Sequence, residues 1–172
     1  MTYEITGPFR LDRFDELTPD RALPEFVSVN FGKYREFPRK TWQVHAQNGF
    51  VDLCHAFRIY TNTIPPCSGL IDTKSCIVAI TRIWVAHDAE TQFLIGCDDR
   101  VRVYLGNNLI GEKTKYNQFD PYEQFSATVK LKAGVNTITV IVSNTANTNW
   151  NWNGFSLILT NNLNSEQMRC IY

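Results

Sequence analysis

The sequence predicts an all-β fold, an antiparallel β-sandwich. Three observations point to it. After residue 40, apolar and polar residues alternate with a period of two in many short runs, which is the pattern of strands. Turn residues separate these runs at close spacing, and no ten-residue segment has the pattern of a helix. No internal repeat of fixed period is visible, which disfavours a propeller or a solenoid.

The 172 residues fit one domain, and we expect a single β-sandwich over residues 1–172. Prolines punctuate residues 1–40, which predicts an irregular segment that wraps the sandwich, with a short helical turn starting at Asp12. Residues 161–172 are expected to form a C-terminal tail with one helical turn over 165–170.

The strands are expected in quick succession after this segment. We predict them at residues 40–45, 49–53, 56–60, 76–87, 92–97, 101–105, 128–131, 136–143 and 155–160, with pairing resumed at 109–110 after the turn at 106–108.

Two of these runs say most about the layers. Residues 76–87 are apolar on both faces, which is typical of a central strand. In the run 101–105, valines alternate with Arg102 and Tyr104, which indicates one buried and one polar face. Trp42 and Trp84 fall inside strand patterns, so we expect both in the core.

The charge balance excludes some partners. Lys+Arg 17 and Asp+Glu 17 leave no net charge, so we expect neither a nucleic acid nor an anionic membrane as a partner. No apolar run is long enough to cross a bilayer, and the first residues do not read as a signal peptide.

The five cysteines form no C-x-x-C pair, which argues against a zinc site of the usual spacing. Two interpretations remain open: small buried thiols, or a disulfide between Cys67 and Cys76 around a turn-rich segment.

A series of short motifs carries a resemblance over nearly the whole chain. The motifs follow one another at residues 5–9, 42, 49–53, 79–81, 96–107, 129–138 and 152–157. In this order they resemble the carbohydrate-binding-module-like jelly-roll accessory domain of bacterial glycoside hydrolases and other polysaccharide-degrading proteins. The resemblance implies a sandwich of the jelly-roll, galactose-binding-domain-like type. It also implies that this sandwich is non-catalytic, is extracellular or on the cell surface, and binds sugar or supports a catalytic domain of a larger parent.

The acidic element Gly96-Cys97-Asp98-Asp99 is also similar to the calcium-and-sugar site of protective-antigen-type lectin domains. That resemblance implies a calcium ion ligated by Asp98 and Asp99. From the residues themselves, two loop carboxylates together with carbonyl and amide oxygens suit calcium. The alternative is a solvated turn whose aspartates cap backbone groups and pair with Arg100 or Arg102. Both interpretations stay open.

The segment 144–153 has the composition that a sugar site requires. Sugars present apolar C–H faces and rims of hydroxyls, so a site needs an aromatic platform beside short amide or carboxylate groups. Trp150 and Trp152 alternate with asparagines in this segment, although Trp152 fits the core equally well. The predicted ligand-binding residues are Trp150, Asn151, Trp152, Asn153, Asp98, Asp99, Arg102 and Tyr104, with Tyr104 lining a cleft beside Arg102.

Enzyme motifs for nucleophilic, metal-dependent or nucleotide chemistry are absent from the sequence. The neighbouring Asp98 and Asp99 would point to opposite faces, unlike the facing carboxylates of glycosidases. We therefore predict a non-catalytic carbohydrate-binding module, with calcium as the one cofactor left open. The alternatives are a structural accessory domain that packs on a catalytic domain or mediates assembly, and a small polysaccharide-acting enzyme.

Overall fold

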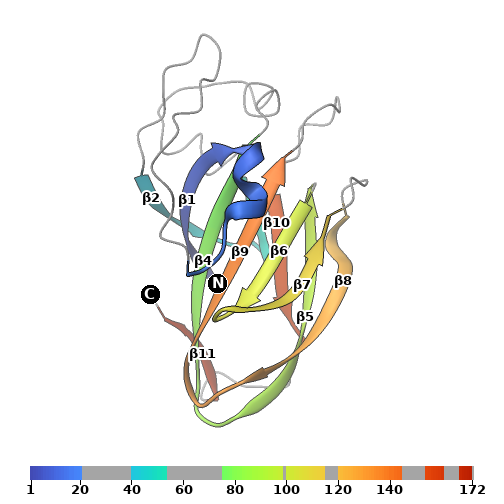
Figure 1. The fold of residues 1–172 in the computed structure, drawn as a ribbon. Coiled ribbons are helices and arrows are strands. Elements are labelled where there is room, and N and C mark those ends of the chain that lie inside the picture. The colour runs from blue at the N-terminus through green and yellow to red at the C-terminus, as the bar shows by residue number, and fades with distance from the viewer. Residues whose placement is uncertain are drawn as a thin grey trace.

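Two antiparallel β-sheets pack face to face in the computed structural model (Figure 1), which describes residues 1–20, 40–53, 75–98, 100–114, 120–144, 154–160 and 167–171. The predicted all-β sandwich is thereby confirmed. No helix within these ranges is long and apolar enough to cross a membrane.

The larger sheet, called the large sheet below, has seven strands in the order β2-β1-β4-β9-β6-β7, with β11 also paired to β4. The small sheet has the order β3-β10-β5-β8. The strands of the large sheet are β1 (Thr2–Arg10), β2 (Lys40–His45), β4 (Ser75–Val85), β6 (Arg100–Leu105), β7 (Asn108–Lys113), β9 (Gly134–Asn144) and β11 (Met168–Ile171). Those of the small sheet are β3 (Phe50–Asp52), β5 (Ala89–Asp98), β8 (Asp120–Leu131) and β10 (Gly154–Leu159).

From β3 onward, consecutive strands alternate between the sheets, apart from the β6–β7 hairpin. This alternation is the jelly-roll connectivity that the sequence predicts.

The core lies between the two inner faces. Every second residue of β4, such as Ile83 and Val85, packs against inward residues of the small sheet such as Phe93 and Leu157, and all four are fully buried. The rings of Tyr3 and Phe155 meet edge to face, with their centroids 5.2 Å apart, and so join the two sheets.

The first strand corrects the expectation of an irregular N-terminal segment. Residues 2–10 form β1, which lies between β2 and β4. A register shift between Thr6 and Phe9 takes up the Gly7-Pro8 pair, and Gly7 has φ 145°. A bulge thus lets the strand continue past a proline that would otherwise end it. The 3-10 helix η1 (Leu11–Glu16) follows, at the place of the predicted helical turn. Residues 21–39 lie outside the described part.

The other predicted elements show smaller differences. The helical turn expected over 165–170 is wrong, because Met168–Ile171 form β11. The strand expected over 128–131 begins eight residues earlier, at Asp120. The run expected at 56–60 lies outside the described residues. Cys76 and Cys97 are buried, as the first interpretation expects, and the alternative disulfide between Cys67 and Cys76 stays a prediction because Cys67 lies outside the described residues.

Candidate functional site

Strand ends of both sheets meet at one end of the sandwich, drawn at the top of Figure 1, and we call it the loop end. In the small sheet Asp98 pairs with Gly154, and in the large sheet Ser75 pairs with Asn144. Arg100, two residues after Asp98, pairs with Ser143, which places the two sets of strand ends together. The acidic corner and both ends of the segment 145–153 are therefore at the same end of the molecule.

The fold explains why a corner forms after Asp98. β5 ends there in the small sheet, and β6 begins at Arg100 in the large sheet, so the chain changes sheets across one residue. On the paired strand, position 154 accepts only glycine without a shift of the backbone, because a Cβ there would clash with the carbonyl oxygen of Val51. The backbone of the loop end is thus held closely by β3 and β5.

The side chains predicted to bind at this end are not described. Asp99, Trp150, Asn151, Trp152 and Asn153 lie outside the described residues, and only the backbone of Asp98 is placed. Their roles, including calcium ligation, stay predictions. The described residues contain no group of three His, Cys, Asp or Glu side chains that could hold a metal ion.

Arg102 and Tyr104 share the outer face of the large sheet, as their spacing predicts, but they lie beneath η1. The Tyr104 ring is only 7% exposed and packs in a second apolar cluster with Phe14 and Leu17 of the N-terminal segment. Tyr104 therefore contributes to the packing of that segment, and its contact with a sugar stays a prediction.

Four charged residues and one phenylalanine, which we call the η1 clasp, join the short helix to β6 and β7. Its members are Phe14, Asp15, Arg100, Arg102 and Glu112. Arg100 and Arg102 each donate to Oδ1 of Asp15, over 3.0 and 2.7 Å. Their guanidinium groups also lie over the Phe14 ring, 4.2 and 4.8 Å from its centroid.

The clasp is electrically balanced. Arg102 also donates to the Phe14 carbonyl oxygen and pairs with Glu112 at 3.4 Å, so two carboxylates match two guanidinium groups. The arrangement favours positioning of η1 over the binding of an external anion. Sequence reasoning missed it because Asp15 is 85 residues from Arg100, in a segment expected to be irregular.

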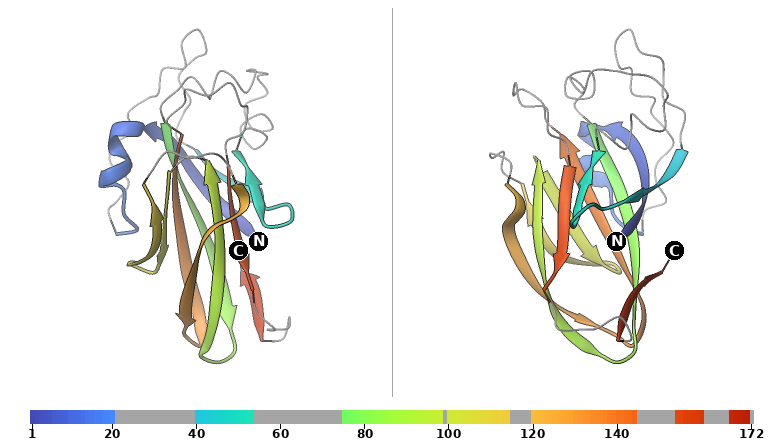
Figure 2. Two further views of the ribbon diagram at one scale, coloured as in Figure 1. Left: turned by 90° about the vertical axis from the view of Figure 1, so that its right-hand side faces the viewer. Right: turned by 180° about the vertical axis from the view of Figure 1, so that it is seen from behind.

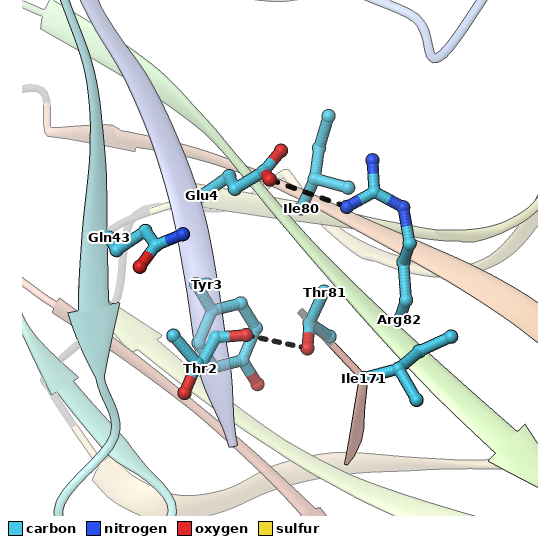
Figure 3. A pocket seen from close by; sticks show the side chains of 8 residues that line it. All are labelled: Thr2, Tyr3, Glu4, Gln43, Ile80, Thr81, Arg82 and Ile171. Carbon is cyan, nitrogen blue, oxygen red and sulfur yellow. Dashed lines mark hydrogen bonds and ion pairs between the residues drawn. The ribbon is translucent and has the colours of Figure 1, made fainter.

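A shallow hollow lies where β1 and β11 share one edge of β4 (Figure 3). It is lined by Thr2, Tyr3, Glu4, Gln43, Ile80, Thr81, Arg82 and Ile171 and is partly open to solvent. Arg82 pairs with Glu4 at 3.4 Å, and the Thr81 hydroxyl donates to the Thr2 carbonyl oxygen over 2.7 Å. The hollow has room for about a single water molecule, so it does not enclose a ligand.

Trp84 corrects another expectation, because it is not a core residue. Its neighbours Ile83 and Val85 point inward and are fully buried, whereas Trp84 is half-buried on the outer face. The guanidinium of Arg169 on β11 lies over its ring, 4.7 Å from the centroid.

The fold also occurs as a segment of larger enzymes. No protein-family model matches the chain, and no curated protein sequence matches it. The structure is similar to a β-glucosidase from Kluyveromyces marxianus, with a TM-score of 0.52 and 10% identity over 96% of this chain and 16% of that one. It is also similar to the GH31 α-xylosidase from Xanthomonas citri, with a TM-score of 0.51 and 10% identity over 96% of this chain and 14% of that one.

At this identity the similarity shows the fold alone. The chain spans less than a fifth of either enzyme. A family 35 carbohydrate-binding module from an environmental isolate is matched over 56% of this chain and 69% of that one, with 17% identity and a TM-score of 0.36.

Proposed function

We propose that this chain is a non-catalytic carbohydrate-binding β-sandwich that serves a catalytic domain acting on glycans, outside the cell or at its surface. The observation that carries the proposal is the strand register at the loop end. Asp98 pairs with Gly154, so the acidic corner adjoins the end of the segment rich in tryptophan and asparagine. The occurrence of the same fold within a β-glucosidase and an α-xylosidase supports the choice of partner.

Each residue type at the loop end has a role in this proposal. Trp150 offers an apolar ring on which the C–H face of a sugar stacks. Asn151 and Asn153 donate and accept hydrogen bonds with hydroxyl groups. Asp98 and Asp99 accept hydrogen bonds from hydroxyls directly or hold a calcium ion that binds them. Trp152 is either a second platform or a core residue at the start of β10.

Binding of neutral oligosaccharides tests the proposal. We expect Trp150→Ala and Asp99→Asn each to weaken binding about tenfold or more in calorimetry, because each removes a direct contact. Asp88→Asn is the matched control: it removes the same charge in the turn between β4 and β5, at the opposite end, and should leave the affinity unchanged.

Two results would contradict this assignment. One is the absence of binding by the wild-type chain to any glycan of a broad array. The other is a Trp150→Ala, Asp99→Asn double variant with wild-type affinity. Titration with calcium chloride and then with EDTA examines the metal separately: if Asp98 and Asp99 ligate calcium, EDTA should lower the glycan affinity of the wild type and leave Asp99→Asn unaffected.

A packing role without a sugar site is the second candidate, favoured by two exposed apolar side chains on the large sheet. Leu109 is 48% exposed and Val135 58% exposed. Self-association in light scattering that Val135→Glu abolishes, together with an empty glycan array, would favour this function over the first.

A further inference from the structure

The outer face of the large sheet is covered over only part of its area. Phe14 and Leu17 of the N-terminal segment pack on residues such as Val78 and Ile141. Farther from the loop end the described elements leave the face open. We call this part the open face, and the register lays out its six residues as two neighbouring rows, Arg169-Trp84-Val135 and Ile171-Arg82-Thr137. It is therefore built on three neighbouring strands of the large sheet, β11, β4 and β9.

Arg169 is the most unusual residue of the open face. Its side chain is exposed, yet the guanidinium is held 4.7 Å from the centroid of the Trp84 ring. Among the described residues it has no carboxylate partner and no hydrogen-bond acceptor. The indole thus fixes the position of a positive charge whose N–H donors no described residue occupies, and a fixed position lowers the entropic cost of binding a ligand.

A second positive charge lies beside it. Arg82 is two residues from Trp84 on the same face of β4, a separation of about 7 Å. Its partner is Glu4, at 3.4 Å, and the two side chains are 38% and 37% exposed, so the pair is open to water. Arg82, Arg169 and Glu4 leave one net positive charge around an indole, in a chain with no net charge.

The hollow continues this surface. Arg82 and Ile171 belong both to the open face and to the lining of the hollow (Figure 3).

These features suit one class of ligand. A guanidinium binds a carboxylate through two parallel hydrogen bonds, and Trp84 with Val135 offers apolar surface for the C–H face of a pyranose ring. An inorganic anion would leave the apolar surface unused, and a neutral sugar would leave the charge unused. We propose that the open face is a second binding site, which takes a carboxylate-bearing oligosaccharide with the carboxylate on Arg169 and the ring against Trp84. This site shares no residue with the loop end, so an experiment can refute either proposal without refuting the other.

The experiment compares an oligogalacturonate with a neutral cello-oligosaccharide of equal length. Binding is measured by calorimetry and by NMR of the Trp84 indole N–H signal, which Trp84→Phe identifies. We expect the wild type to prefer the acidic ligand and to shift the Trp84 signal. Arg169→Gln should weaken binding roughly tenfold to a hundredfold, because it removes a charged hydrogen-bond donor. Lys130→Gln removes the same charge from the small sheet and should change nothing.

A gain of affinity provides a test that misfolding cannot imitate. Glu4→Gln removes the carboxylate that competes for Arg82, so it should strengthen binding of the acidic ligand and leave that of the neutral one unchanged.

Several outcomes would overturn the proposal. They are a wild type that does not bind the oligogalacturonate at millimolar concentration, binding that Arg169→Gln leaves intact, and binding that Trp150→Ala abolishes, which would place the ligand at the loop end. Equal affinity for a hexamer of glutamate would show a surface that merely collects negative charge.

Discussion

Tyr3 shows how one buried residue makes the stability of the fold depend on pH in the alkaline range. It is fully buried, and its hydroxyl has the weak acceptor Met1 Sδ at 3.5 Å. Burial, with a smaller contribution from Cys170, raises the pKa of the phenol well above its ordinary value. The folded chain therefore favours the neutral phenol. The resulting stability is complete below the pKa of the unfolded chain, about 10, and is lost as the pH rises above it.

Tyr3→Phe should remove this alkaline sensitivity. At pH 7 we expect a small change in the free energy of unfolding, because the lost hydrogen bond is weak. Above pH 10 the wild type should lose stability more steeply than the variant, by about 1.4 kcal/mol per pH unit. Urea unfolding between pH 8 and 12 measures the two slopes, and parallel curves would contradict the argument.

Single residues also show where sequence reasoning succeeds. The alternation in 101–105 correctly placed Arg102 and Tyr104 on one face, because strand geometry fixes that relation locally. The pattern of residues 76–87 gave a wrong prediction for Trp84. A strand that is apolar on both faces is expected to be covered on both, but the N-terminal segment packs over the outer face at Val78, whereas Trp84 is in contact with Arg169. What lies above a sheet face depends on remote segments, and the pattern of the strand does not contain it.

At the scale of elements, η1 is held on the large sheet both by a buried apolar side chain and by an exposed ion pair. Phe14 is fully buried beneath it, whereas the Asp15 side chain is 67% exposed. We expect Phe14→Ala to cost about 3–5 kcal/mol through the cavity it leaves. Asp15→Asn should cost at most about 1 kcal/mol, because solvent screens an exposed ion pair. Chemical denaturation of both variants measures the difference, and an equal loss in both would show that the charges hold the helix.

A second pair of elements is joined at the end opposite the loop end. In the turn after β4, Asp88 accepts hydrogen bonds from Lys132 Nζ and from the Ala133 amide in the turn after β8, over 2.7 and 2.8 Å. The Lys132 ammonium and the Ala133 amide lower the pKa of Asp88. A lowered pKa stabilises the fold above the unfolded value, and that contribution is lost as the pH falls through the folded value.

Asp88→Asn should therefore lower the melting temperature at pH 7 but not at a pH well below 4, where the wild-type carboxyl is itself protonated. Thermal scans of both chains between pH 2 and 7 check this convergence. Because the pair is exposed, the difference at pH 7 should be small and should shrink in high salt. A difference independent of pH would mean that shape, not charge, matters at this position.

The elements that the sequence missed share a physical cause. The strand expected over 128–131 extends back past Pro121 because β8 is the edge strand of the small sheet, where a missing amide donor is tolerated. β1 continues past Pro8 by a bulge. β11 is four residues long, too short for its alternation to be distinguished from a turn of helix. In all three cases, hydrogen bonding to a strand distant in the sequence determines where the element lies.

For the whole molecule, the order of strands separates two regions. At the loop end, the pairing of Asp98 with Gly154 places the acidic corner beside the strand that follows the segment 145–153, whose side chains lie outside the described residues. The two ends of the described chain lie elsewhere: Thr2 and Ile171 line the same hollow, halfway along an edge of β4 (Figure 2). The sequence predicted the first arrangement in outline, but the second depends on β1 and β11 sharing one strand, which neither segment reveals by itself.

This nearness of the two chain ends predicts that the fold tolerates circular permutation. A short glycine-serine linker from residue 172 to Met1, with new ends between Gly106 and Asn107, should give a chain that unfolds cooperatively and binds glycans like the wild type. The new ends fall in an exposed turn, where a Cβ on Gly106 would meet nothing within 4 Å. The matched control carries the same linker but opens β9 between Val140 and Ile141, which breaks a strand paired on both sides and should prevent folding. Circular dichroism and calorimetric melting compare the two chains, and a first permutant as unfolded as the second would contradict the placement of the two ends.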